Sequence, residues 1–348
     1  MEHLLIIRFS ALGDVAMTVP VVYSLARQYP ELRITVLSKD FMQPLFSRLP
    51  SNVHFIGVNL KKEYAGLKGL NRLFRRICEE QITAVADLHD VLRTQYLRFR
   101  FRMKGIPTAH IRKERNGRKQ LTRRKNKKLV PQKTSFRKYT DVLAASGYPV
   151  ETDFRSLFGD GRGDLSLLPF TEKKDDAIWI GIAPFAAHKG KIYPLEQMER
   201  IIARLSEYPA IHIFLFGADG SEQQLLHDWH QRYPHTTAVP DKRLTLDKEL
   251  ILISHLDVML SMDSANMHLA SLVATPVVSI WGATHPYAGF AGWNQPAENQ
   301  LQAELPCRPC SIFGNRPCFR KDYACLHRIK TEEILDKLNH IAHFRPAP

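Results

Sequence analysis

The chain has 348 residues, of which 44% are hydrophobic and 24% charged, a composition ordinary for a globular protein with two α/β domains. No apolar run reaches the roughly 20 residues of a membrane helix, and the first residues lack the basic start of a signal peptide, so we expect a cytoplasmic protein. The isolated Cys78 and four clustered cysteines do not form the pattern of a secreted disulfide scaffold.

The net charge of +14 is concentrated in one segment. Between Arg112 and Lys138, thirteen Lys or Arg residues stand against Glu114 alone, so this segment carries +12. Such a segment indicates an acidic partner, and nucleic acid, an anionic membrane surface and a polyanionic substrate are the three candidates. The alternative is a solvated loop that is partly disordered.

The first half of the chain alternates between predicted strands and helices. Buried parallel strands are expected at the apolar runs 4–9, 33–37, 53–58 and 84–88. Helical spacing predicts a helix over 15–28, kinked by Pro20, and another that begins within 139–146. The stretch 151–175 is rich in Gly, Asp and Ser and is the best candidate for a linker.

The alternation restarts after the linker. We expect strands at 178–183, 211–217, 258–260 and 277–282, a short strand at Val239, and helices at 195–207, 221–233 and 246–256. The amphipathic segment Thr331 to His343 is expected to cross back onto the first domain. The predicted fold is α/β of the GT-B class, with two Rossmann-like, doubly wound domains facing each other across a cleft. The predicted domains are 1–160 and 175–325, followed by the C-terminal helix 326–348.

The turn after the strand at 258–260 contains the strongest motif, Asp263-Ser264-Ala265-Asn266-Met267-His268-Leu269-Ala270. Small residues at a helix start let a ligand approach the free backbone N–H groups, and the helix dipole favours an anion there. This arrangement predicts a site for a phosphate or diphosphate that is bound without a metal.

Three segments resemble glycosyltransferase family 9, the heptosyltransferases. The Asp263 motif, followed by Gly282-Ala283-Thr284-His285-Pro286, resembles the donor-site motif of that family, although Ala265 stands where Gly is usual and Ala283 where Pro is usual. The run Arg8-Phe9-Ser10-Ala11-Leu12-Gly13-Asp14-Val15 resembles its N-terminal signature, and the loop 183–194 resembles its lysine element.

The resemblance covers both halves of the chain and implies a function. It implies an inverting transfer of heptose from ADP-heptose to an inner-core lipopolysaccharide acceptor of the Kdo-lipid A type. The first domain would bind the acceptor and the second the nucleotide sugar, at the inner face of the cytoplasmic membrane. No metal, no other cofactor and no nucleic acid is expected.

Asp14 is the predicted general base. A sugar hydroxyl is a poor nucleophile, so a carboxylate must take its proton during attack on the anomeric carbon. The family resemblance supports this role for Asp14, and the alternative is a helix N-cap.

Donor binding is predicted for six residues. The resemblance assigns the diphosphate to Lys191, because Tyr193-Pro194 follows it, with Lys189 as the competing choice. A glutamate at the place of Glu222 contacts the ribose in the family, but capping of the next helix is an equally good interpretation. The complete predicted set is Lys191, Glu222, Asp263, Ser264, Ala265 and His268.

Acceptor binding is predicted from the run Asp87-Leu88-His89, where the family has Asp-x-Gln. Together with the basic segment, this region would suit phosphorylated or acidic sugars. The predicted residues are Ser10, His89, Arg93, Arg123 and Arg124. The alternative is a solvated helix start that His89 caps.

Four cysteines, Cys307, Cys310, Cys318 and Cys325, have the spacing C-x2-C-x7-C-x6-C. Four thiolates with one close pair are a pattern of structural zinc sites, and buried reduced thiols are the alternative. Similar clusters recur in heptosyltransferases without a part in the chemistry, so no metal is assigned to the reaction.

Two other classes of protein share single features with this sequence. A nucleic-acid-binding protein could use the basic segment, but the chain has no recognised module and too few aromatic residues nearby for a stacking platform. A Rossmann dehydrogenase is disfavoured because neither strand-to-helix turn carries Gly-x-Gly-x-x-Gly. A related glycosyltransferase with another nucleotide-sugar donor stays open.

Overall fold

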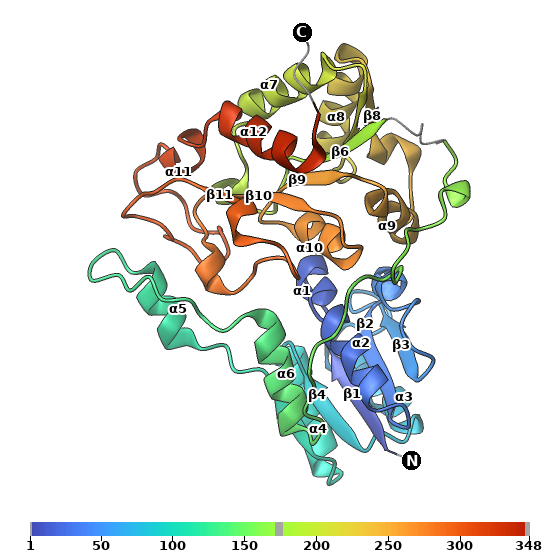
Figure 1. The fold of residues 1–348 in the computed structure, drawn as a ribbon. Helices are drawn as coiled ribbons and strands as arrows, with labels where there is room; N and C mark the ends of the chain where they lie inside the picture. The colour runs from blue at the N-terminus through green and yellow to red at the C-terminus, as the bar shows by residue number, and fades with distance from the viewer. Residues whose placement is uncertain (1, 171–176, 345–348) are drawn as a thin grey trace. The chain divides into compact units, whose positions relative to one another are not determined.

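The computed structural model describes residues 2–170 and 177–344 and divides into two compact units. One unit comprises residues 1–113 and 133–157, and the other comprises 114–132 and 158–348. Each unit is built on one parallel sheet with helices packed against it (Figure 1). Positions 171–175 of the predicted linker and 345–348 of the predicted C-terminal segment lie outside the described residues. Within the described residues, no helix combines the length and the apolar character that a membrane span requires.

The sheet of the first unit contains five parallel strands in the order β3-β2-β1-β4-β5. These strands are β1 (His3–Ile7), β2 (Arg33–Lys39), β3 (Val53–Val58), β4 (Ala84–Asp87) and β5 (Thr108–His110). Every residue of β1 and β4 is buried, as the apolar runs predict for central strands. The chain moves from β1 outward to β3 and then returns to place β4 on the other side of β1. The carboxyl ends of β1 and β4 therefore form the topological switch point, where open α/β sheets bind ligands.

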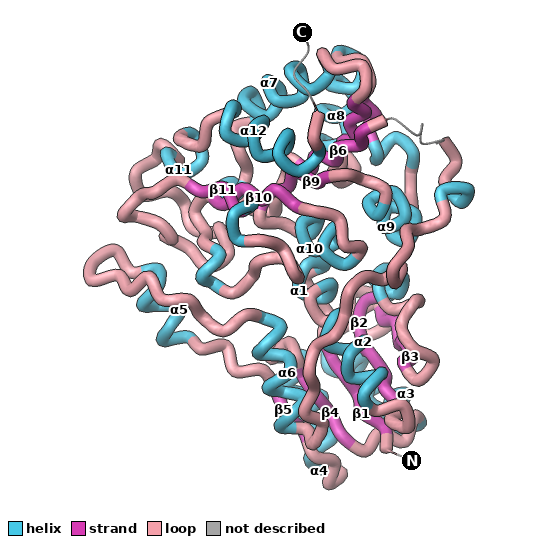
Figure 2. Tube along the Cα trace, viewed as in Figure 1, coloured by secondary structure: helices cyan, strands magenta, loops and turns pink. Residues whose placement is uncertain are grey.

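Helices cover both faces of this sheet (Figure 2). On one face, Leu5 and Ile7 of β1 join a core with Leu73, Phe74 and Phe101, residues of α3 (Gly66–Glu79) and α4 (Leu92–Met103). Leu4 and Ile6 are buried toward the opposite face. Two further helices pack together: α2 (Val19–Gln28) and α6 (Ser135–Ala145).

The helix predicted over 15–28 is two helices, α1 (Leu12–Ala16) and α2. Pro20 lies in the first turn of α2 and does not kink a continuous helix. The prediction of one kinked helix is therefore wrong. The first turn tolerates Pro because its backbone nitrogen has no intrahelical bond to make there.

The sheet of the second unit contains six parallel strands in the order β11-β10-β9-β6-β7-β8. They are β6 (Ile178–Ala183), β7 (Ile211–Leu215), β8 (Thr236–Ala238), β9 (Val258–Met262), β10 (Val277–Trp281) and β11 (Gln300–Gln302). The chain again moves outward, from β6 to β8, and then returns so that β9 pairs with the other side of β6. The switch point of this sheet lies at the carboxyl ends of β6 and β9.

One face of this sheet packs on three helices through a core that includes Ile180, Ile182, Ile202, Leu226 and Leu338. These helices are α7 (Leu195–Ser206), α8 (Ser221–Arg232) and α12 (Thr331–Ala342). Two other helices pack together, and the second also packs on β9 and β10: α9 (Leu246–Ser254) and α10 (Ala265–Leu272).

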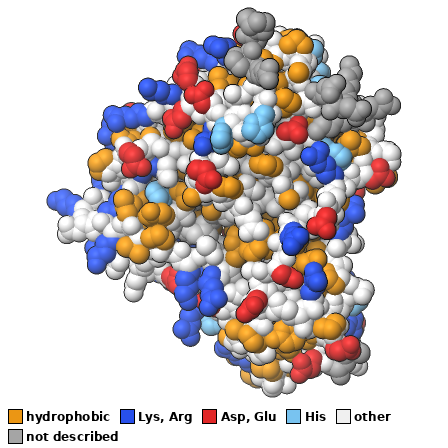
Figure 3. All heavy atoms as spheres, viewed as in Figure 1, with side chains coloured by type: hydrophobic (Ala, Val, Ile, Leu, Met, Phe, Trp, Pro, Cys, Tyr) orange, Lys and Arg blue, Asp and Glu red, His pale blue; other side chains and the backbone are white. Residues whose placement is uncertain are grey.

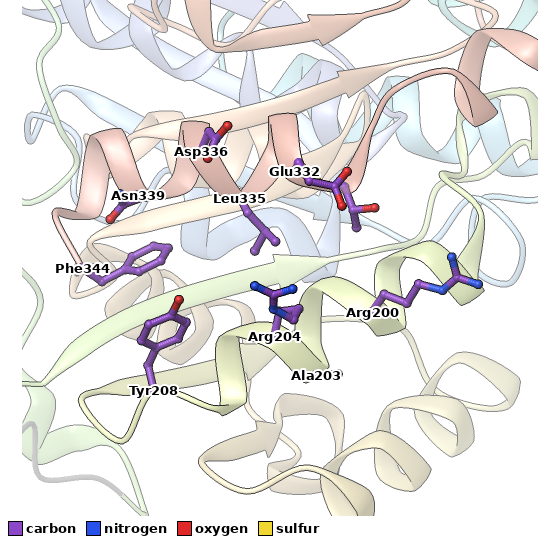
Figure 4. Close-up of a pocket in the computed structure, with 10 residues that line it drawn as sticks. Arg200, Ala203, Arg204, Tyr208, Glu332, Leu335, Asp336, Asn339 and Phe344 are labelled. Carbon is purple, nitrogen blue, oxygen red and sulfur yellow. The ribbon is translucent and has the colours of Figure 1, made fainter. Parts of the chain in front are cut away.

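Helix α12 packs on α7, β9 and β10. This differs from the predicted return of the segment to the first domain, because its apolar residues Ile334 and Leu338 complete the core of the second unit. An open groove of about 500 Å³ separates α12 from α7 and is lined by Arg200, Arg204, Tyr208 and Asp336 among others (Figure 4). None of the predicted site residues lines this groove.

The middle of the basic segment forms α5 (Arg115–Thr122), followed by a non-helical segment that runs back along it. We call residues 114–132 the basic hairpin. The hairpin belongs to the second unit, whereas the sequence-based prediction places it in the first domain, 1–160. Leu121 is fully buried, the Gln132 N–H donates to the carbonyl of Tyr287 at 2.9 Å, and the Arg118 guanidinium lies over Phe290 and Phe313.

The remaining elements are short. A single turn, α11 (Ala324–His327), precedes α12. The 3₁₀ helices are Asp40–Leu45, Leu165–Leu167, Lys189–Lys191, Val239–Lys242, Pro286–Ala288 and Ala297–Asn299.

Candidate functional site

A buried arginine follows β1 at the switch point of the first unit. The Arg8 Nη1 donates to the carbonyl of Leu88 at 2.6 Å, and Nη2 lies 2.7 Å from Asp14 Oδ2. The carbonyl of Leu88 belongs to the segment after β4, so Arg8 links the ends of the two central strands. Its positive charge balances the Asp14 carboxylate.

Asp14 is the third residue of α1 and has two distinguishable oxygens. Oδ2 accepts the Ala11 N–H at 3.1 Å as well as the bond from Arg8, and this is the helix-start role that the sequence also predicts. Within residues 2–170 and 177–344, Asp14 Oδ1 has no hydrogen-bond partner, and 30% of the Asp14 side chain is exposed. The Tyr139 hydroxyl donates to the Asp14 main-chain oxygen at 3.3 Å. The capping contact therefore occupies Oδ2 and, among the described residues, leaves Oδ1 without a partner.

His89 lies just after β4 and is held by its neighbours. Asp87 Oδ1 accepts the N–H groups of His89 and Asp90, each at 2.9 Å. The Phe9 N–H donates to His89 Nδ1 at 3.4 Å, so in the neutral ring Nε2 carries the hydrogen and donates to Ser10 Oγ at 3.5 Å.

Burial, reinforced by the charge of Arg8, lowers the pKa of His89 from 6.5 to about 3. At neutral pH the ring is therefore uncharged. The neutral ring can donate or accept a hydrogen bond, but it carries no positive charge that could pair with a phosphate.

The depressed pKa of His89 predicts acid sensitivity. Below about pH 6.5 the unfolded chain protonates this ring while the folded chain does not, so the free energy of unfolding falls with falling pH. When the pH falls from 7 to 4.5, we expect the free energy of unfolding of His89→Gln to decrease by about 2 kcal/mol less than that of the unsubstituted protein. Urea titrations at several pH values measure this, with the exposed His54→Gln as control. Parallel pH curves for all three proteins would contradict the prediction.

Lys191 and Asp263 meet at the switch point of the second unit. The Lys191 Nζ lies 2.9 Å from Asp263 Oδ2 and donates to the Asp263 carbonyl, also at 2.9 Å. Both side chains are largely buried. The competing Lys189 lies over the ring of Tyr323 at 5.4 Å. The geometry thus separates the two lysines and favours Lys191 as the one near the Asp263 motif.

The loop that carries Lys191 is packed tightly. The Ala283 N–H donates to the Gly190 carbonyl at 2.8 Å. Gly314 has a φ of +76°, and a Cβ at that position would lie 2.7 Å from Lys191 Cγ. A larger residue at 314 would therefore displace the lysine stem.

Helix α10 begins beside this ion pair. Ser264 is its N-cap residue, and the Ser264 and Ser261 hydroxyls lie 3.2 Å apart. Ser264, Ala265 and Asn266 are partly exposed, and the N–H groups of a first turn have no intrahelical acceptor. His268 is buried on the same helix. Five predicted donor residues, Lys191, Asp263, Ser264, Ala265 and His268, thus gather around one helix start.

Glu222, the sixth predicted donor residue, lies in the first turn of α8. Its Oε2 accepts the Ala218 N–H at 2.9 Å, so the capping interpretation describes its contact in the structure. A ribose contact stays a prediction.

The predicted acceptor residues divide between the two units. Ser10 and His89 share a hydrogen bond in the first unit, where Arg93 is exposed on α4. Arg123 and Arg124 lie in the basic hairpin of the second unit. The Arg124 guanidinium stands 4.4 Å above the ring of Phe319.

Three residues that support the site were not singled out from the sequence: Arg8, Tyr139 and Arg98. Arg98 pairs with Asp87 at 3.2 Å and with Asp90 at 3.0 Å. The available signal for Arg8 was a charged residue within the apolar run 4–9. Tyr139 and Arg98 come from helices distant in sequence and gave none.

The cysteines Cys307, Cys310, Cys318 and Cys325 are free thiols and line one small cavity. Burial raises the pKa of Cys325 to about 11. Over the described ranges, no three His, Cys, Asp or Glu side chains form a group arranged to hold a metal ion. The zinc site stays an untested alternative to reduced thiols.

Two parallel-sheet α/β units, each with polar residues at its switch point, are the architecture of the GT-B glycosyltransferases. A family model described as glycosyltransferase family 9 (heptosyltransferase) matches residues 70–316. The chain belongs to this family and is a glycosyltransferase.

Individual relatives agree with this assignment. The chain is 26% identical over 324 residues to lipopolysaccharide heptosyltransferase 3 of Escherichia coli. The matched region covers 85% of this chain and 88% of the relative. A family 9 glycosyltransferase structure from Veillonella parvula has a TM-score of 0.71 at 17% identity, covering 98% of this chain and 97% of that one. E. coli heptosyltransferase WaaC with ADP-2-deoxy-2-fluoro heptose has a TM-score of 0.65 at 15% identity, covering 97% and 99%. The structures establish the shared GT-B fold.

Proposed function

We propose that this protein is an inverting heptosyltransferase that moves heptose from ADP-heptose to an inner-core lipopolysaccharide acceptor of the Kdo-lipid A type. The family assignment and the name of the E. coli relative support the sugar and the acceptor. The WaaC structure holds an ADP-heptose analogue, which supports the donor.

The observation that carries the proposal is the position of Lys191 against Asp263 at the start of α10. A departing nucleoside diphosphate gains negative charge, and a positioned ammonium together with free N–H groups stabilises that charge. In the proposed reaction these groups do the work for which other enzymes use a divalent metal.

Asp14 supplies the other half of the reaction. Its Oδ1 takes the proton of the acceptor hydroxyl as the hydroxyl oxygen attacks the anomeric carbon. Attack from the face opposite the diphosphate forms the new glycosidic bond as the bond to ADP breaks, so the anomeric configuration inverts. Arg8 holds Oδ2 and keeps Oδ1 free.

The proposal is tested first by ligand-induced stabilisation. ADP is expected to raise the Tm of the full chain more than UDP or GDP at equal concentration, because a ligand that binds only the folded state stabilises it. Transfer is then followed by the mass of one heptose added to Kdo-lipid A, with no added Mg²⁺ or Mn²⁺. A larger increase in Tm with another nucleotide would mean that the donor carries that nucleotide in place of ADP. Tight RNA binding without transfer would favour the nucleic-acid alternative.

We further propose that the enzyme works at the inner face of the cytoplasmic membrane. Exposed Arg123, Lys125 and Lys128 lie on the basic hairpin close to exposed Leu129 and Val130. In Figure 3, Lys and Arg side chains lie beside hydrophobic ones at the edge of the second unit that carries the hairpin. Charge and apolar side chains together suit an anionic lipid surface.

We expect replacement of Arg123, Lys125 and Lys128 by Gln to release the protein from anionic vesicles, since each charge contributes about 1 kcal/mol near the surface. Lys127 is left intact because its ammonium binds carbonyls within the protein. Vesicle sedimentation at low salt measures the effect. The matched control replaces exposed Lys61, Lys62 and Lys68 of the first unit, and equal loss in both variants would contradict a specific role of the hairpin.

A further inference from the structure

A cationic pocket of about 390 Å³ lies within the second unit, between the basic hairpin and the loop that leads to α11. The hairpin contributes Thr122 and Arg124, and the loop contributes Arg316, Phe319 and Arg320. None of the lining residues is acidic. Figure 1 shows the hairpin alongside the loops before α11.

The two walls of the pocket are fixed to one another. The Lys127 Nζ donates to the carbonyl of Cys307 at 2.7 Å and to that of Pro309 at 2.9 Å. The Arg124 guanidinium stacks on the ring of Phe319, a residue that is 46% exposed. The pocket is therefore already formed, and the guanidinium of Arg124 is oriented before a ligand arrives.

The pocket has a positive charge that the protein does not neutralise. Arg320 pairs with Asp322 at 2.8 Å, so its charge is balanced. Arg124 and Arg316 form no ion pair with any carboxylate in the part of the chain that the structure describes. Two guanidinium groups with free donors are the chemistry that binds phosphate in a bidentate way.

We propose that this pocket binds a phosphomonoester group on the saccharide acceptor. The guanidinium groups of Arg124 and Arg316 bind the phosphate oxygens, and Phe319 packs on the apolar face of the sugar ring. The volume falls in the range of small-molecule sites. A concave pocket of this size suits one phosphorylated sugar better than a flat bilayer. The proposal rests on the proposed function, because it names a recognised feature of that acceptor.

The test compares two soluble probes: delipidated inner-core oligosaccharide that retains its phosphates, and the same material after phosphatase treatment. The unsubstituted full chain is expected to bind the phosphorylated probe about 10- to 100-fold more tightly by calorimetry. Arg316→Gln is expected to remove most of that preference and leave the affinity for the dephosphorylated probe unchanged. Arg328→Gln, an exposed arginine of the same unit, is the matched control.

Binding is measured without donor, so its outcome is separate from that of transfer. If the phosphate preference is present and depends on Arg316, the pocket is a phosphate-binding site even when no heptose transfer is found. Equal affinity for the two probes, or a preference that survives both Arg316→Gln and Arg124→Gln, would overturn the proposal. Loss of anionic-vesicle binding in Arg316→Gln without any phosphate preference would also overturn it and assign the pocket to a lipid headgroup.

Discussion

Asp14→Asn is expected to reduce turnover by about 10²- to 10⁴-fold, the range for loss of a general base. An amide oxygen can still accept the Ala11 N–H that Oδ2 accepts now, so the start of α1 is preserved. The amide cannot take up a proton from the acceptor hydroxyl. Affinity for ADP is expected to stay within a few-fold, because the base acts mainly in the chemical step.

The measurement is kcat with ADP-heptose and a soluble acceptor, together with Tm and ADP affinity of the same preparation. Asp153→Asn is a matched control: this exposed carboxylate of the first unit also pairs with an arginine, Arg27, at 3.7 Å. Its kcat is expected to be unchanged. Retention of most of the turnover in Asp14→Asn would leave Asp14 as a helix-start residue only.

Lys191→Met is expected to weaken ADP binding by about 10- to 100-fold and to lower kcat by about 10²-fold or more, since the diphosphate contact strengthens as charge develops. The substitution also leaves the buried carboxylate of Asp263 without its cation, which costs about 3–5 kcal/mol of stability. Calorimetry with ADP and thermal unfolding therefore have to be measured together.

Two further variants separate binding from stability. Lys191→Met combined with Asp263→Asn removes both charges and is expected to recover much of the Tm without recovering ADP affinity. Lys189→Met, whose ammonium lies over Tyr323, is expected to change ADP affinity far less. If Lys189 proved the more important lysine for ADP binding, the role assigned to Lys191 would have to be given up.

The apolar runs were sufficient to predict most of the fold. The strands at 53–58 and 178–183 match the structure residue for residue. The central strand β6 is buried over five of its six residues and reads as a continuous apolar segment, as buried parallel strands do. The edge strand β3 is only partly buried, so its run of residues is less uniformly apolar. The helix over 15–28 was predicted less well. Periodicity continues across Met17 and Thr18, but two separate helices satisfy it, and Pro20 fits the first turn of the second one.

The sequence by itself also located the polar residues that follow strands, including Asp14 and Asp263, since a turn after a buried strand is visible locally. Only the tertiary structure decided which of these meet. Strand order puts β4 beside β1 and β9 beside β6, and this pairing brings Leu88 to Arg8 and Asp263 to Lys191. The basic hairpin also joined the second unit through Leu121, Arg118 and Lys127. Long-range pairing depends on burial summed over whole elements, which no local pattern of residues contains.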